Sequence, residues 1–127
     1  MRIERRFTKH GRSAYAEIDF RKATSEIKNP DGSVVFRLAD IDVPRQFSQV
    51  AADILAQKYF RKAGVPARLK RVEENDVPSF LWRSVADEAA LAELPEDERY
   101  GSETDARQVF TRLAGTWTYW GWKGGYF

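Results

Sequence analysis

The clearest periodic pattern of apolar and polar residues runs from Ser102 to Phe127. At about 100° per residue, one narrow helical face collects several apolar side chains. These are Ala106, Val109, Phe110, Leu113, Trp117 and Trp120. Ser102 is the predicted N-cap, and Asp105 follows three residues later, as in a relative of the capping box. We expect this stripe to face the core of the domain.

Large aromatic residues also occupy a second face of the same helix. Tyr119 and Trp122 project away from the stripe, and Tyr126 and Phe127 follow two glycines. A helix with aromatic side chains on both faces is normally buried on both. We infer that the chain is part of something larger or is a module that docks.

A β region is predicted over residues 15–43. Residues 15–20 alternate between two sets of side chains, and so do residues 33–38. Between them, Asn29-Pro30-Asp31-Gly32 has the composition of a tight turn, which predicts a hairpin. Because two strands alone are marginally stable, the face formed by Val34, Phe36 and Leu38 should pack on a helix or join a larger sheet.

The first helix is predicted over residues 44–64. Either Pro44 lies in its first turn, or Ser48 caps a shorter version. Gly64 is the expected residue after its last turn. Its apolar arc consists of Phe47, Val50, Ala51, Ile54 and Leu55.

Residues 65–101 read as a loop that contains a short helix. Ser84 is its predicted cap, with Asp87 three residues later. The acidic residues Glu73, Glu74 and Asp76 resemble a metal or acid–base cluster, but an exposed loop is the simpler interpretation. At least one residue of Phe80, Leu81 and Trp82 should be buried. Together these segments predict a small α+β module with a β-hairpin or short antiparallel sheet, two main helices and one short helix.

The composition limits the kinds of chemical site that these residues can form. With 127 residues the chain is one domain by length, and its formal net charge is only +2. It has no cysteine, so thiolate metal sites and cysteine chemistry are excluded within these residues. A lone histidine, His10, argues against a zinc site, and we expect no bound metal. The sequence has neither a long apolar run nor the apolar region of a signal peptide, so we expect a cytoplasmic protein without membrane contact.

Two groups of basic residues could contact phosphate. The first is the basic arm, residues 1–14, which carries Arg2, Arg5, Arg6, Lys9 and Arg12 against Glu4. A solvated arm held to the domain by Ile3 and Phe7 is the simpler interpretation. The second group is a phosphate-contact patch formed by Arg61, Lys62, Arg68, Lys70 and Arg71, for which helix-end stabilisation is the default explanation. We therefore do not expect nucleic acid as a partner.

Four long strings of the sequence resemble a known family. They are "KNPDGSVVFRL", "SQVAADILAQKYFRKAGVP", "LKRVEENDVPSFLWRS" and "ETDARQVFTRLAGTWTYWGWKGGYF". They are similar to the N-terminal region of bacterial class II ribonucleotide reductases, which depend on adenosylcobalamin. The resemblance runs from about Arg5 to Phe127, nearly the whole chain.

The resemblance implies a parent enzyme in which an α/β barrel carries the chemistry. Cobalamin would generate a thiyl radical on a barrel cysteine, and further cysteines would reduce a ribonucleoside diphosphate for deoxyribonucleotide synthesis. No catalytic, cobalamin-binding or allosteric residue of the family maps onto these 127 residues, which alone cannot perform the reaction. The remainder of the reductase chain becomes the expected partner, and a homodimer of the parent stays open.

The resemblance also suggests a role for the aromatic end. Its large side chains would contact the neighbouring domain: Trp117, Tyr119, Trp120, Trp122, Tyr126 and Phe127. The chain would then be a structural or docking domain of the reductase. A stand-alone protein-interaction module and a nucleic-acid-binding module are the alternatives.

Overall fold

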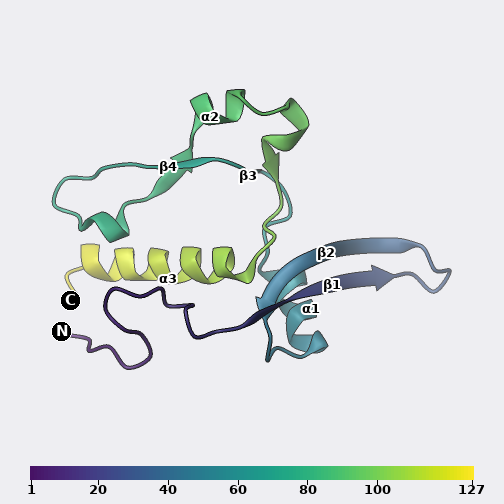
Figure 1. Cartoon of the computed structure of the whole chain (residues 1–127), viewed down its shortest axis with the longest axis horizontal. Coiled ribbons are helices and arrows are strands. Elements are labelled where there is room, and N and C mark those ends of the chain that lie inside the picture. The colour runs from purple at the N-terminus through teal and green to yellow at the C-terminus, as the bar shows by residue number, and fades with distance from the viewer.

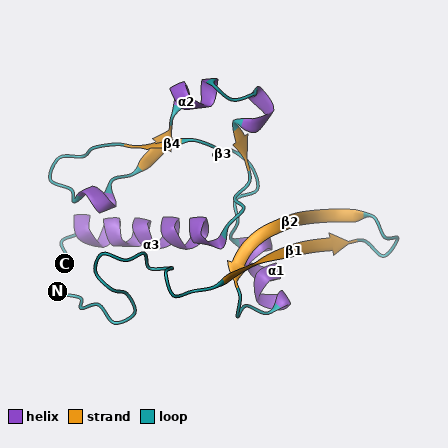
Figure 2. Ribbon diagram, viewed as in Figure 1, coloured by secondary structure: helices purple, strands orange, loops and turns teal.

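The computed structural model describes all of residues 1–127 (Figure 1). It confirms a small α+β module (Figure 2). The strands are β1 (Phe20–Lys28), β2 (Val34–Pro44), β3 (Val65–Pro66), β4 (Leu69–Arg71), β5 (Ser84–Ala86) and β6 (Tyr100–Gly101). The helices are α1 (Gln49–Lys58), α2 (Glu88–Ala92) and α3 (Ala106–Lys123), with short 3-10 turns η1 (Ser79–Leu81) and η2 (Glu96–Glu98).

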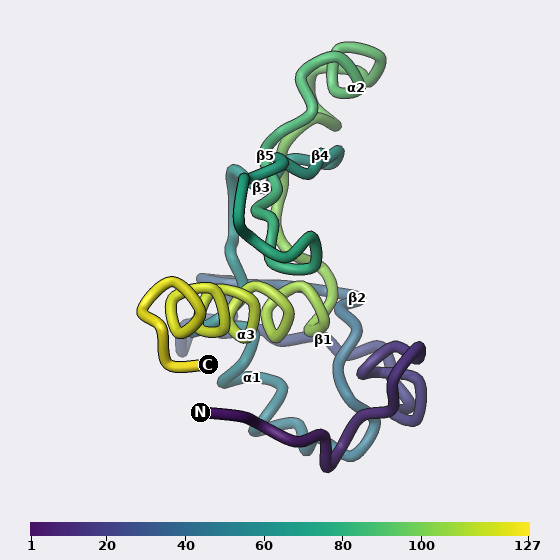
Figure 3. Tube along the Cα trace, turned by 90° about the vertical axis from the view of Figure 1, so that its left-hand side faces the viewer, coloured from purple at the N-terminus to yellow at the C-terminus, as the bar shows by residue number.

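The elements occupy three levels around α3. The β1–β2 hairpin lies beside the beginning of α3 at about the same height, α1 lies lower, and the lobe formed by residues 65–101 stands above α3 (Figures 1 and 3). The lobe contains two small antiparallel sheets, in which β3 pairs with β6 and β4 with β5. The two ends of the chain lie close together in both views.

The predicted hairpin turn is confirmed. The N–H of Asn29 donates to the carbonyl of Ser33 at 2.8 Å, and Gly32 takes a φ of +88°, which a residue with a Cβ rarely adopts. Asp31 accepts hydrogen bonds from the hydroxyl and the backbone N–H of Ser33, and these bonds lower the pKa of Asp31. The turn therefore depends on the residue types that predicted it.

The strand expected at residues 15–20 is wrong for all but its last residue. Residues 13–18 form turns, in which the N–H of Ala16 donates to Ser13 and that of Ile18 to Tyr15. Pairing with β2 begins only at Phe20, opposite Pro44, where β2 ends. Residues before Phe20 thus have no strand to pair with.

The core lies at the end of β2 that is far from the turn. Ile41 and Val43 are fully buried there, whereas Val34 is exposed. Of the expected face, Leu38 packs against the core cluster, Phe36 is half-buried and only Val34 is exposed. Between the pairs Ser25–Leu38 and Ala23–Ile41 there is one extra residue in β2, and Asp40 takes a φ of +55°, so Ile41 and Val43 join Leu38 on the core side.

Helix α1 is shorter than the predicted 44–64. The Ser48 hydroxyl accepts a hydrogen bond from the N–H of Ala51 at 3.1 Å, so the shorter alternative is confirmed. The helix ends at Lys58 because Phe60 turns into the core, and Gly64 lies in the following connection. Its buried face consists of Ala52, Leu55 and Ala56. Two members of the predicted arc, Val50 and Ile54, are exposed.

The caps of α3 and α2 both lie three residues after the predicted serines. Asp105, not Ser102, caps α3, and Gln108 completes its capping box. Asp87, not Ser84, caps α2. In both places the residues before the cap are extended, because Ser84–Ala86 form β5 and residue 104 accepts a hydrogen bond from the backbone of β2.

Candidate docking face

The first half of α3 belongs to the core of the chain. Ala106 and Val109 are buried, and Phe110 and Leu113 pack against the core cluster. The ring of Phe110 meets that of Phe47, just before α1, edge to face at 6.4 Å between centroids. This half of the predicted stripe is confirmed.

The second half of α3 extends past the hairpin and α1 (Figure 1). Trp117 and Trp120 continue the stripe that is buried upstream, but they are 63% and 64% exposed. The expectation that they belong to this chain's own core is wrong. The stripe is longer than the core that it covers, so two indole rings are left facing solvent.

The other face of α3 already has a partner within the chain. Tyr119 and Trp122 are half-buried, and η1 in the lobe contacts α3. The Tyr119 hydroxyl is 3.0 Å from both carboxylate oxygens of Glu74, and Lys123 Nζ is 2.8 Å from Glu74 Oε1. The face expected to await a neighbour is thus partly covered, and the face expected to be buried is open.

These contacts change two pKa values in opposite directions. The hydrogen bond from Lys123, assisted by that from Tyr119, lowers the pKa of Glu74 below its ordinary 4.5. The same contact with Glu74 raises the pKa of Lys123 above its ordinary 10.5. Both shifts favour the charged pair. We call these three residues the lobe latch, because they connect the loop before η1 to the last turns of α3.

The acidic segment that includes Glu74 is therefore a structural contact. No group of three or more His, Asp or Glu side chains in the chain is arranged to hold a metal ion. Of the three neighbouring residues Phe80, Leu81 and Trp82, Leu81 is buried, and Trp82 donates its indole N–H to the carbonyl of Val77 at 3.0 Å. Phe80 is 74% exposed.

The last residues fold back against the end of α3. The N–H of Tyr126 donates to the carbonyl of Gly121 at 3.0 Å. A Cβ on Gly121 would lie 2.7 Å from the ring of Phe127, so only glycine admits this ring position. Tyr126 and Phe127 are both exposed. With Trp117 and Trp120 they form four of the six predicted docking residues, and we call these four the open aromatic face.

A buried ion pair fixes the start of α3. Glu103 is 3% exposed and accepts hydrogen bonds from Arg112 Nε and Nη2 at 3.0 to 3.2 Å. It also accepts one from the backbone N–H of Arg61 at 2.8 Å. Arg112 donates in addition to the carbonyl of Tyr59, the C-cap of α1. This clamp joins the C-terminal end of α1 to α3. The sequence contained no sign of it, because the pair links two separate segments through backbone groups.

The predicted phosphate-contact patch is exposed, but its side chains turn to different carbonyls. Lys62 donates to Gln57 at 2.8 Å, and its Nζ lies 5.6 Å from the centre of the Phe36 ring. Arg71 donates to the carbonyls of Ser79 and Trp82. The other members, Arg61, Arg68 and Lys70, are exposed as well. Phosphate binding there stays a prediction.

The basic arm is attached at its end through Tyr15. The Tyr15 hydroxyl hydrogen-bonds to Thr111 of α3 at 2.9 Å and donates to the carbonyl of Arg107 at 3.4 Å. Ile3 and Phe7, which were expected to hold the arm to the domain, are instead exposed, Phe7 to 96%. None of the helices combines the length and the hydropathy of a membrane span.

Comparison with known proteins gives one consistent result. Residues 21–127 match the family described as class II vitamin B12-dependent ribonucleotide reductase. Along all 127 residues the chain is 87% identical to a vitamin B12-dependent ribonucleotide reductase of Agrobacterium fabrum and 72% identical to one of Bradyrhizobium diazoefficiens. It spans 10% of the length of each relative. The chain therefore belongs to the class II vitamin B12-dependent ribonucleotide reductases, and it corresponds to their N-terminal region.

Proposed function

We propose that this chain is a docking domain that holds the N-terminal region of a class II reductase against the rest of the enzyme. The observation that carries the proposal is the open aromatic face. An apolar stripe that is buried at Ala106 and Val109 continues, in the same helix and on the same side, to the exposed Trp117 and Trp120. A neighbour that extends the core along α3 would cover them.

The proposed neighbour is the remainder of the reductase chain. The curated relatives are about ten times longer than these residues, so a much larger body accompanies this region in them. Covering the exposed part of one tryptophan is worth roughly 1–2 kcal/mol. Two tryptophans with Tyr126 and Phe127 could hold a domain in place.

The chemistry belongs, in this proposal, to the part of the enzyme outside these residues. The relatives are named as vitamin B12-dependent. We propose that the parent uses adenosylcobalamin to reduce ribonucleoside diphosphates in the cytoplasm. Residues 1–127 contain no cysteine, and no residue of the chain is assigned to the cofactor. The contribution of this domain is therefore scaffolding.

The test is a double variant, Trp117→Ala with Trp120→Ala, in the full-length reductase. We expect lower thermal stability and weaker protection of this domain from proteolysis than in the unmodified enzyme. Phe80→Ala is the control, because Phe80 is an aromatic residue of the lobe that is exposed to a similar extent, 74%. Equal behaviour of the double variant and the control would contradict the docking role.

A further inference from the structure

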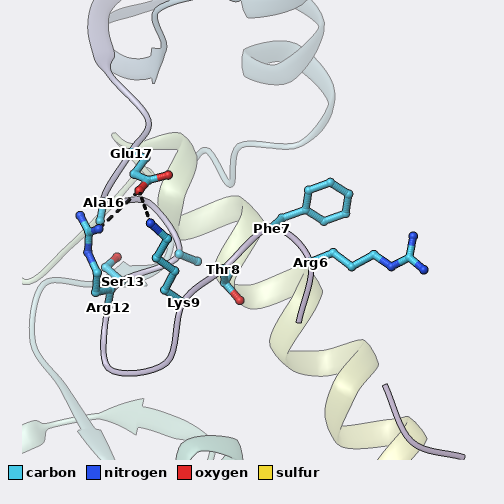
Figure 4. Close-up of a pocket in the computed structure, with 9 residues that line it drawn as sticks. Arg6, Phe7, Thr8, Lys9, Arg12, Ser13, Ala16 and Glu17 are labelled. Atoms are coloured by element: carbon cyan, nitrogen blue, oxygen red, sulfur yellow. Dashed lines mark hydrogen bonds and ion pairs between the residues drawn. The ribbon is translucent and has the colours of Figure 1, made fainter. Parts of the chain in front are cut away.

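The basic arm contains charged side chains that form no ion pair within the domain. Lys9 and Arg12 both pair with Glu17, at 3.4 and 3.3 Å (Figure 4). Arg2, Arg5 and Arg6 form no ion pair, although Arg5 donates to the Thr8 hydroxyl at 2.9 Å. Three arginines close together in the sequence are thus available to an external anion.

Apolar side chains lie among these arginines and are equally free. Phe7 is 96% exposed and Ile3 is 68% exposed. In Figure 4, Phe7 and Arg6 extend to the same side of the arm, away from the ion pairs at Glu17. A hollow of about 140 Å³ lies in the arm, and Arg6, Phe7 and Lys9 are among the residues that line it. The arm therefore presents an aromatic ring next to cations, with hydroxyl groups nearby.

The sequence alone favoured an arm held to the domain by Ile3 and Phe7 and no nucleic-acid partner, but both side chains are exposed. We propose that the basic arm binds single-stranded nucleic acid. A base would stack on the ring of Phe7, and Arg2, Arg5 and Arg6 would contact successive phosphates. Aromatic rings combined with cations along a backbone path are the general means by which proteins hold single strands. The spread of the cations over residues 2–12 suits a polymer with several phosphates better than a free nucleotide.

The backbone of the arm favours a nucleic acid over a membrane surface. Residues 1–19 contain no helix, whereas segments that lie on membrane surfaces are usually amphipathic helices.

The experiment measures fluorescence anisotropy of a labelled oligonucleotide, dT12, with the 127-residue chain at a series of salt concentrations. Each phosphate contact with a single strand contributes about −0.7 to the slope of log affinity against log salt. Three arginines predict a slope of about −2, which is a loss of about 20-fold between 50 and 200 mM salt. If Lys9 and Arg12 break their ion pairs with Glu17 and contact phosphates as well, the slope becomes about −3.5 and the loss of affinity about 100-fold.

Two variants separate the contribution of the arginines to binding from that of the aromatic ring. Arg5→Gln with Arg6→Gln should weaken binding and make the slope less steep by about 1.4. Phe7→Ala should weaken binding at least about fivefold and leave the slope unchanged, because stacking releases no ions. The controls are Lys28→Gln with Arg37→Gln, which removes the same charge on the exposed hairpin, outside both basic groups, and Phe80→Ala. Both controls should bind like the unmodified chain.

Several results would overturn the proposal. The proposal fails if dT12 does not bind at low salt, or if the control variants lose as much affinity as the arm variants. It also fails if a duplex of the same length binds as tightly as dT12 or more tightly. Binding of ATP as tight as that of dT12 would show a nucleotide site instead. Binding to anionic lipid vesicles without binding to dT12 would show a membrane contact instead.

Discussion

Removal of Arg112 tests the clamp between α1 and α3. Arg112→Met keeps most of the side-chain length but leaves Glu103, at 3% exposure, without its charged partner. Breaking a buried ion pair in this way typically costs about 3–5 kcal/mol. Because the Arg112 side chain is still 26% exposed, water can partly replace it, and we expect about 2–3 kcal/mol.

The assay is urea unfolding of the chain followed by circular dichroism. With a typical dependence on denaturant of about 2 kcal/mol per molar, the midpoint should fall by roughly 1 M. Arg37→Met is the control, because Arg37 pairs with Glu26 at 3.2 Å on the exposed hairpin and such pairs are worth about 0–1 kcal/mol. Arg112→Met combined with Glu103→Gln should cost less than the sum of the two single changes.

The reasoning fails if Arg112→Met destabilises the chain no more than Arg37→Met does. It also fails if the two changes at the clamp are strictly additive, since additivity would mean that Glu103 and Arg112 do not interact in solution.

Two further predictions concern the latch and the helix caps. Because the pKa of Glu74 is lowered, the stabilising contribution of Glu74 is complete above pH 4.5 and is lost as the pH falls through the lowered pKa. Because the pKa of Lys123 is raised, the contribution of Lys123 is complete below pH 10.5 and is lost as the pH rises through the raised pKa. The difference in melting temperature between the chain and its Glu74→Gln variant should therefore be constant between about pH 5 and 10 and shrink on either side, and a constant difference at all pH values would contradict the latch. Asp105→Ala should cost about 1 kcal/mol in urea unfolding and Ser102→Ala almost nothing, and the reverse order would show that the cap is misplaced.

Local sequence signals predicted the elements but not their limits. The hairpin turn followed from Asn29 to Gly32 because the conformation of a tight turn depends on the residues within it. A serine and an aspartate at this spacing are both good caps, so local sequence alone predicts each helix start three residues too early. The choice of Asp105 depends on pairing of the preceding residue with β2, which is a long-range contact.

The buried faces were harder to predict for a similar reason. Alternation in β2 changes phase near Asp40, where one extra residue enters the strand, so Ile41 and Val43 face the core on the same side as Leu38, whereas simple alternation would have placed Asp40 and Asp42 there. The period of α3 was predicted correctly, but the period does not reveal how far the core extends beneath the helix. Trp117 is therefore on the predicted stripe and still exposed.

For the candidate docking residues, too, the local sequence predicted their presence but not which of them are exposed. The aromatic end was recognised as unusual because large side chains occupied two faces. Which face was free depended on Glu74, which lies 45 residues from its partner Tyr119. No local pattern indicates that the lobe returns to cover this face of α3.

The most direct test of the docking role is hydroxyl-radical footprinting with mass spectrometry. It compares oxidation of individual tryptophans in the 127-residue chain and in the full-length reductase. Trp117 and Trp120 should be oxidised rapidly in the chain and protected in the full-length enzyme, whereas the half-buried Trp82 should change little. Equal oxidation of Trp117 and Trp120 in both proteins would contradict the account, because it would mean that nothing in the enzyme covers the open aromatic face.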